Sequence, residues 1–235
     1  MFKHVVITRF NIYDPSFSNK IWSTERANYR LSIFENITCS SIASQTNKNF
    51  SWYVISNQKS SRLVLDHLQK LSNIYNFEVI LCSGGISYMM AGSCYNHEVF
   101  YENPYLITTR VDADDALAID HVERVQGEFR EQELDFINFE FGIRKKLGSK
   151  ESTVIVYKEN PFQSLIERVS PPIPVRTVYC AQHQLTHTIA PVHNISNIAR
   201  PAWLQVIHDD NIGNSLGNTK YWNNPDLQTF FKVKT

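Results

Sequence analysis

The sequence lacks a long apolar run, and it has no excess of charge of either sign. No stretch approaches the roughly 20 apolar residues of a membrane span, and the opening MFKHVVITRF holds only one short apolar run, unlike a signal peptide. We therefore expect a cytoplasmic protein without a transmembrane segment, and attachment to the inner membrane face stays open. Lys plus Arg number 23, as do Asp plus Glu. This balance argues against bulk binding to nucleic acid, although a local basic pocket needs few charges.

Several familiar motifs are also missing. The chain has neither the G-x-G-x-x-G fingerprint of dinucleotide-binding domains nor a P-loop. The spacing of three histidines does not match a compact zinc site, and a proline, Pro191, lies among them. These histidines are His183, His187 and His193. The cysteines also lack metal-type spacing, and we expect them to be buried free thiols in a reducing compartment. They are Cys39, Cys82, Cys94 and Cys180.

What is present is an alternation of strand and helix patterns in a chain of 235 residues. Short apolar runs bounded by turn residues predict strands, and apolar residues spaced by three and four predict helices. The strands are expected at 4–10, 49–56, 77–82 and 105–111, and the helices at 25–45, 60–72, 87–101 and from Asp115 onward. This order predicts an α/β fold with a mostly parallel central sheet flanked by helices.

The second half of the chain has a different pattern, which predicts a smaller mixed β region. A strand is expected at 134–139, and a hairpin at 142–150 and 153–157 follows it. Pro161 favours the first turn of a helix over 161–169. Short strands are then expected at 175–180 and 203–208. We expect both halves to form one domain, 1–235.

The stretch YLITTRVDADDAL, residues 105–117, joins a buried-strand pattern to three carboxylates, Asp112, Asp114 and Asp115. In open α/β sheets ligands bind at the carboxyl ends of the strands. Carboxylates this close together repel one another unless a cation or several hydrogen-bond donors neutralise them. The pattern therefore favours a site for a divalent metal and the diphosphate of a nucleotide-linked donor. The alternative is a helix N-cap in a solvated turn.

Several segments together resemble one known family. TRFN near the N-terminus, TRVDADDAL, NPFQSLIERV and WLQVIHDDN, in that order, resemble the rhamnosyltransferases of bacterial polysaccharide synthesis, between Val5 and Ser215. The resemblance implies the GT-A fold of nucleotide-diphospho-sugar transferases. It also implies that residues 1–130 form the nucleotide-sugar-binding half, and that residues 131–235 form the acceptor side and a C-terminal tail.

The resemblance further implies roles for individual residues. In GT-A enzymes a D-x-D after the fourth strand holds Mn²⁺ or Mg²⁺ together with the donor, and here the D-x-D is Asp112 and Asp114. His208, late in the chain, matches the position of a further metal ligand. The residues expected to bind the donor are Arg9, Arg110, Asp112 and Asp115.

The predicted activity is metal-dependent transfer of a sugar, with rhamnose as one candidate. The donor would be a UDP-, GDP- or dTDP-sugar, and the acceptor a saccharide or another hydroxyl compound. If transfer inverts the sugar, a carboxylate must take the acceptor's proton, and the candidates are Asp209 and Asp210, with Glu140 behind them. Two alternatives stay open. One is a sugar-nucleotide nucleotidyltransferase, which usually needs a Gly-rich loop after the first strand, and the segment TRFNIYDP does not provide one. The other is a non-catalytic carbohydrate-binding protein.

Overall fold

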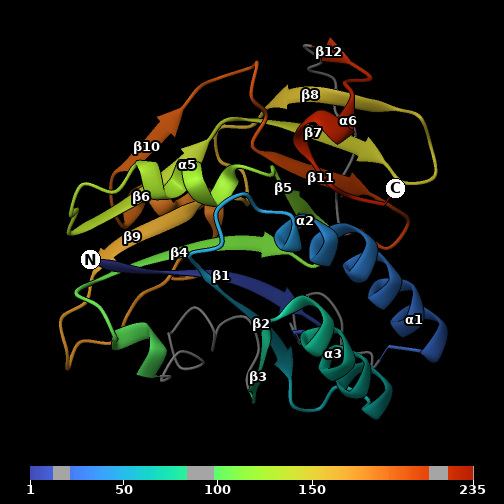
Figure 1. Cartoon of the computed structure of the whole chain (residues 1–235), viewed down its shortest axis with the longest axis horizontal. Helices are drawn as coiled ribbons and strands as arrows, with labels where there is room; N and C mark the ends of the chain where they lie inside the picture. Colours follow the sequence, from blue (N-terminus) through green and yellow to red (C-terminus); the bar gives the residue numbers. More distant parts are fainter. Residues whose placement is uncertain (13–21, 84–97, 212–221, 235) are drawn as a thin grey trace.

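Two β-sheets with helices packed around them form the fold of the computed structural model, which describes residues 1–12, 22–83, 98–211 and 222–234 (Figure 1). The larger sheet has the strand order β10-β6-β9-β4-β1-β2-β3. Its strands are β1 Phe2–Phe10, β2 Ser51–Asn57, β3 Glu78–Cys82, β4 Tyr105–Asp112, β6 Leu134–Phe139, β9 Ser164–Arg168 and β10 Val192–Ile195. The smaller sheet has the order β12-β8-β7-β11-β5. Its strands are β5 Ala116–Leu117, β7 Phe141–Lys146, β8 Ser152–Val156, β11 Trp203–Ile207 and β12 Trp222–Asn223.

Strands β1 to β4 form the parallel block that the apolar runs predicted. β1 lies between β2 and β4 and is parallel to both, and β2 is parallel to β3. Val5, Val6 and Ile7 are fully buried because both faces of the sheet are covered. The mixed character predicted for the second half is confirmed as well, since the smaller sheet contains parallel and antiparallel pairs. The helices are α1 Thr24–Ile33, α2 Ser40–Ala43, α3 Arg62–Tyr75, α5 His121–Gly127 and α6 Leu227–Phe230, with the π-helix η1 Phe34–Cys39 and the 3₁₀-helices η2 Glu98–Tyr101 and η3 His183–Thr188.

The helix predicted at 25–45 is present as the continuous run α1–η1–α2. Ser23 caps its start, because the Ser23 hydroxyl accepts a hydrogen bond from the Arg26 amide at 3.2 Å. Leu31 packs in the core beside the larger sheet, and Ile37 packs in the core of the smaller one. The run therefore lies along the junction of the two sheets. The π turn in its middle places Thr38 against the acidic loop that follows β4.

The helix predicted over 161–169 is wrong, because residues 164–168 form β9. Apolar and polar side chains in this segment fit either element, and Pro161 favoured a helix start. The strand forms because both of its edges find partners. β9 is antiparallel to β4 on one side and to β6 on the other, so a central place in the sheet satisfies its backbone.

The strand predicted over 175–180 is also wrong. The backbone amides of this segment bond to side chains instead of to a neighbouring strand. Arg176 and Thr177 donate to the Glu167 carboxylate at 2.8 and 2.9 Å, and Val178 donates to the Thr108 hydroxyl at 2.8 Å. Thr177 has φ of 57°, which an extended strand does not allow.

The helix predicted from Asp115 onward starts later than expected. Ala116 and Leu117 form β5, and α5 begins only at His121. Asp115 is not a cap, because its carboxylate accepts the Val206 amide of β11 at 2.9 Å. Together, β5 and this hydrogen bond join the acidic loop to the smaller sheet.

The cysteine prediction holds only in part. Cys39 and Cys180 are free thiols, and burial raises the pKa of the Cys180 thiol to about 11. Cys82 is disulfide-bonded, so the expectation of free thiols is wrong there. The helix expected at 87–101 lies outside the described residues except for its last turn, η2. Among the residues that the structure describes, no helix has both the length and the apolar character of a membrane span.

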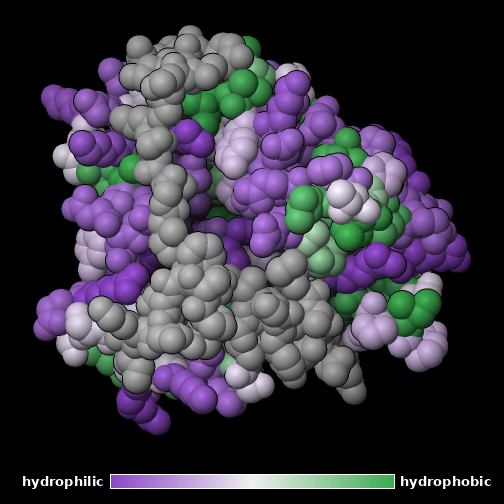
Figure 2. Space-filling view, turned by 180° about the vertical axis from the view of Figure 1, so that it is seen from behind, coloured by the Kyte–Doolittle hydropathy of each residue, from purple (hydrophilic) through white to green (hydrophobic). Residues whose placement is uncertain are grey.

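The face shown in Figure 2 is largely hydrophilic, and its hydrophobic residues form small groups between polar ones. The exposed large apolar residues of the described chain come from separate elements, such as Ile74 in α3, Leu81 in β3 and Leu185 in η3. Single exposed apolar residues are ordinary on protein surfaces. They therefore give no argument for an apolar docking face in this part of the chain.

Two buried histidines make stability depend on pH. Burial lowers the pKa of His4 to about 3 and that of His121 to about 4. The unfolded chain takes up protons near pH 6.5 while the folded chain does not, so the free energy of unfolding should fall as pH drops from about 6.5 toward 5. Each histidine contributes a slope of up to about 1.4 kcal/mol per pH unit.

Urea unfolding at pH 7, 6 and 5 measures this slope. We expect His4→Gln to remove roughly one histidine's share of it. His187→Gln is the matched control, because the His187 side chain is exposed. An equal slope in wild type and His4→Gln would contradict the assignment.

Candidate functional site

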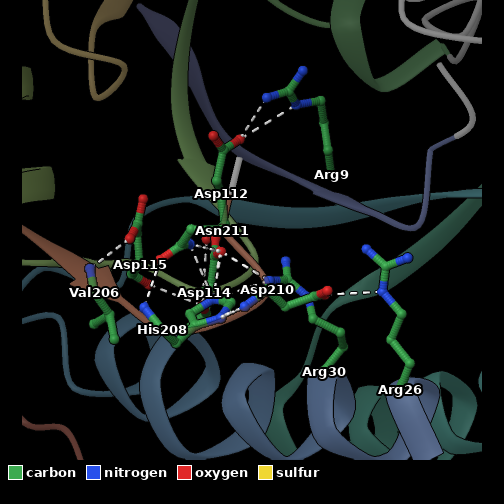
Figure 3. A network of polar contacts seen from close by, with 11 residues as sticks. Arg9, Arg26, Arg30, Asp112, Asp114, Asp115, Val206, His208, Asp210 and Asn211 are labelled. Carbon is green, nitrogen blue, oxygen red and sulfur yellow. Dashed lines mark hydrogen bonds and ion pairs between the residues drawn. The ribbon is translucent and has the colours of Figure 1, made fainter. Parts of the chain in front are cut away.

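The site begins where β1 and β4 end at the same edge of the larger sheet. Arg9 and Asp112 are register partners on these parallel strands. The Arg9 Nη2 donates to Asp112 Oδ1 at 2.9 Å. Arg110 lies two residues before Asp112, on the same face of β4, and its Nη2 donates to Asp112 Oδ2 at 3.0 Å. One carboxylate is therefore held between two guanidinium groups, of which Figure 3 shows that of Arg9.

This arginine pair gives the sheet edge a positive excess. Burial would raise the pKa of Asp112, but Arg110 and Arg9 outweigh it and hold that pKa well below its usual range. Among the contacts of the described residues, two guanidinium groups share one carboxylate, so this cluster carries more positive than negative charge. Both guanidinium carbons also lie over the ring of Tyr179, at 5.1 Å for Arg9 and 5.2 Å for Arg110. The Arg110 Nε is buried and has no hydrogen-bond partner within the described chain.

Asp114 belongs to a second cluster, on the side of the loop away from Arg9 (Figure 3). Three nitrogens surround its Oδ2 atom: Arg30 Nη1 at 3.0 Å, His208 Nε2 at 3.0 Å and Asn211 Nδ2 at 3.1 Å. Burial would raise the pKa of Asp114, but the His208 hydrogen bond and the Arg30 charge lower it. Asp114 is therefore ionised and fixed by residues from α1 and from the segment after β11.

His208 is oriented by its own neighbours. The Asp210 amide donates to His208 Nδ1 at 3.2 Å, and the His208 amide donates to Asn211 Oδ1 at 2.6 Å. These contacts turn the other ring nitrogen, Nε2, toward Asp114 Oδ2. The ring of Tyr29 packs edge-on against the imidazole, with centroids 5.8 Å apart.

The predicted bases occupy three different settings. The Asp210 carboxylate accepts Arg26 Nε at 3.0 Å, beside the Asp114 cluster. The Asp209 side chain is exposed. Glu140 is buried just after β6, and no hydrogen bond or ion pair among the described residues joins its carboxylate to either cluster. Asp115 is also buried, and burial together with the charges of Asp114 and Asp112 raises its pKa well above the usual value.

Sequence reasoning missed the residues that hold the acidic loop in place. The Thr38 hydroxyl donates to the Asp115 carbonyl at 2.9 Å, and the Ser41 hydroxyl donates to the Leu117 carbonyl at 2.9 Å. Gln45 continues the pattern by donating from Nε2 to the Ala118 carbonyl at 2.7 Å. These small polar residues lie on the buried side of a predicted helix. A polar residue on such a face was the signal that could have identified them.

Sequence reasoning also missed Arg26, Arg30, Tyr179 and Asn211. Arg26 and Arg30 are one turn apart on α1 and so lie on one face of that helix. Nothing in the sequence says which acidic residues that face meets. The contact forms only because α1 crosses from one sheet to the other beside the loop that follows β11.

Asp114 and His208 fit a divalent cation in both donor type and spacing. Carboxylate oxygen and imidazole nitrogen are both common metal ligands, and the two atoms lie 3.0 Å apart. Asp112 instead accepts hydrogen bonds from Arg9, as Figure 3 shows, and from Arg110. The described residues include no group of three His, Cys, Asp or Glu side chains able to hold a metal. A cation here would need further ligands from water or from substrate phosphates, as is usual for Mg²⁺.

Solved structures support the fold. The Staphylococcus aureus TarS structure of residues 1–349 in complex with UDP matches with a TM-score of 0.50 at 12% identity, over 87% of this chain and 60% of that one. The S. aureus TarS crystal structure matches with a TM-score of 0.50 at 13% identity, over 87% of this chain and 37% of that one. A Desulfovibrio desulfuricans G20 structure described as a "putative nucleotide-diphospho-sugar transferase", with a TM-score of 0.41 and 6% identity, is too distant to carry an argument. The chain thus spans less than two thirds of the length of these TarS structures, and the likeness concerns the fold alone.

Sequence comparison identifies the family. No curated protein matches the chain. The family model described as "Putative rhamnosyl transferase" matches residues 5–218, which is most of the sequence. The chain therefore belongs to this rhamnosyl transferase family, a group of glycosyltransferases, and it has the GT-A-like fold of nucleotide-diphospho-sugar transferases.

Proposed function

We propose that this protein transfers a sugar from a nucleoside-diphosphate donor to a hydroxyl acceptor and depends on a divalent metal. The observation that carries the proposal is the pairing of two clusters at one sheet edge. Arg9 and Arg110 present surplus positive charge, and Asp114 and His208 present a carboxylate and an imidazole beside it. The carboxyl edge of a parallel sheet is where such folds bind nucleotides.

The arginine pair is suited to the donor's diphosphate. Guanidinium groups bind phosphate oxygens through paired hydrogen bonds, and Tyr179 and Asp112 hold both arginines in place. Charge builds up on the diphosphate as the bond to the sugar breaks, so donors fixed beforehand at that position lower the barrier. Asp114 and His208 would hold Mn²⁺ or Mg²⁺, which supplies further positive charge at the leaving group.

A base is needed if transfer inverts the sugar. The acceptor oxygen then forms its bond to the sugar carbon while the bond from that carbon to the diphosphate breaks, and the acceptor's proton goes to a carboxylate. Asp210 and Asp209 are the proposed acceptors of this proton, with Glu140 behind them. Asp210 is held by Arg26 at 3.0 Å, which fixes its direction.

The donor's nucleotide and sugar are proposed on narrower grounds. TarS was solved with UDP, so UDP-sugars are the first donors to test, followed by GDP- and dTDP-sugars. Rhamnose is proposed because the family model bears that name. The acceptor is proposed to be a saccharide or another hydroxyl compound.

Calorimetric titration with UDP, GDP and dTDP, each with and without Mn²⁺, tests this proposal. We expect one nucleotide to bind in the presence of Mn²⁺ and to bind at least about tenfold more weakly without it. Equal affinity with and without Mn²⁺ would refute the metal dependence. Failure of all three nucleotides to bind would refute the transferase proposal and favour a non-catalytic carbohydrate-binding protein.

A further inference from the structure

Arg30 sits at the point where the proposed metal site and the helix α1 meet. Its Nη1 lies 3.0 Å from Asp114 Oδ2 and 3.0 Å from His208 Nε2, and those two atoms are themselves 3.0 Å apart. The three atoms thus form a triangle with nearly equal sides (Figure 3). The Arg30 side chain is only 15% exposed and that of Asp114 only 12%, so water screens this contact weakly.

The sides of this triangle match the distances between neighbouring ligand atoms around a small divalent cation. Adjacent ligands on an octahedral cation with bonds of about 2.1 Å are separated by about 3 Å. The separation of Asp114 Oδ2 and His208 Nε2 therefore suits such a cation, and the Arg30 guanidinium occupies the neighbouring position. A guanidinium and a divalent cation cannot both approach one carboxylate oxygen without strong repulsion.

A second carboxylate, that of Asp210, also lies near Arg30. Its Nε lies 3.9 Å from Asp210 Oδ2, the oxygen that also accepts a hydrogen bond from Arg26 Nε at 3.0 Å. The Arg30 guanidinium carbon lies 5.9 Å from the centre of the Trp22 ring. After leaving Asp114, the positive charge would therefore still have the Asp210 carboxylate as a nearby partner.

We propose that Arg30 is a displaceable internal cation, which neutralises Asp114 until a divalent metal takes its place and which then pairs with Asp210. The proposal rests on the metal site of the proposed function. It makes Arg30 a positioning residue that lowers the affinity of the site for free metal. It also couples metal binding to Asp210, because the displaced arginine arrives at the proposed base.

Titration of the protein with Mn²⁺ in the absence of nucleotide tests this inference. Replacing Arg30 removes the competing charge, so Arg30→Gln should bind Mn²⁺ roughly tenfold or more tightly than wild type, as expected for loss of one charge-assisted hydrogen bond. Arg62→Gln is the control. Arg62 lies on the exposed face of α3 and pairs with Asp66, so its replacement should change Mn²⁺ affinity less than about threefold.

The outcomes separate this inference from the proposed function. If wild type binds Mn²⁺ and Arg30→Gln binds it equally or more weakly, Arg30 is not displaced, and the inference is wrong while the metal site stands. If neither protein binds Mn²⁺, even with UDP, GDP or dTDP present, the proposed metal site is wrong and the inference falls with it.

A second measurement uses wild type and does not depend on the folding of Arg30→Gln. Displacement of Arg30 changes the charge over the Trp22 ring, so Mg²⁺ should alter the tryptophan emission of wild type. The change should disappear in Trp22→Phe, which keeps the other tryptophans. A Mg²⁺-bound wild type, shown by calorimetry, whose emission equals that of the free protein would overturn the inference.

Discussion

Asp114→Asn is expected to lose nearly all sugar transfer while keeping its fold, with kcat/KM falling by roughly 10³-fold. The substitution removes the charge on which Arg30, His208 and Asn211 converge. Under the proposed function it also removes the carboxylate ligand of the cation. Because both effects act at the leaving diphosphate, kcat should fall along with metal affinity. Release of the nucleoside diphosphate from a donor sugar, followed by mass spectrometry, measures the loss.

Asp66→Asn provides the control for this variant. Asp66 lies on the exposed face of α3 and pairs with Arg62 one turn away. Loss of such a surface pair should leave transfer within about twofold of wild type. Transfer by Asp114→Asn at more than about a tenth of the wild-type rate would show that Asp114 does not act at the leaving group.

Gly142→Ala is expected to cause a large loss of stability, about 3 kcal/mol or more. A Cβ atom added at Gly142 would lie 2.1 Å from Cδ2 of Trp203. The indole cannot move aside, because it is fully buried, is stacked on Phe162 with centroids 4.8 Å apart, and donates to the Phe139 carbonyl at 2.8 Å. β7 and β11 must therefore separate. We expect the melting temperature to fall by roughly 6 to 12 °C.

The strain in Gly142→Ala should also displace residues of the candidate functional site. Trp203 begins β11, and Val206 and His208 at the end of that strand contact Asp115 and Asp114. Metal-dependent nucleotide binding should therefore weaken as well. The matched control is Gly127→Ala at the end of α5, where an added Cβ meets nothing within 4 Å. Alanine is favoured in helices, so Gly127→Ala should be neutral or slightly stabilising. Equal melting temperatures for the two variants would contradict this account of the packing.

The parallel half of the fold was predictable because its signals are local. β1 and β4 have apolar residues on both faces, such as Val5 and Val6 in β1 and Leu106 and Ile107 in β4, a pattern typical of strands in a covered sheet. The placement of the acidic cluster followed from the strand order, since parallel strands end at one edge. The distance between Asp114 and His208 could be anticipated only from the family resemblance, because 94 positions separate them in the sequence.

The remaining features depend on contacts that no local pattern specifies. Residues 164–168 became a strand because β4 and β6 each offered a free edge, which overrode the helix signal of Pro161. Asp115 looked like a helix cap, but its carboxylate met the Val206 amide from the distant β11. Arg30 could not be assigned to Asp114, because the direction of α1 is set by packing against both sheets.

The central claim is that this chain cleaves a nucleotide-sugar with the help of a cation at Asp114 and His208. The most direct test incubates wild type with UDP-, GDP- and dTDP-sugars and Mn²⁺ and measures release of the nucleoside diphosphate, with and without a chelator. We predict release from one donor class, its loss on chelation, and its loss in Asp114→Asn. Release that continues undiminished after chelation, or no release from any donor, would contradict the claim.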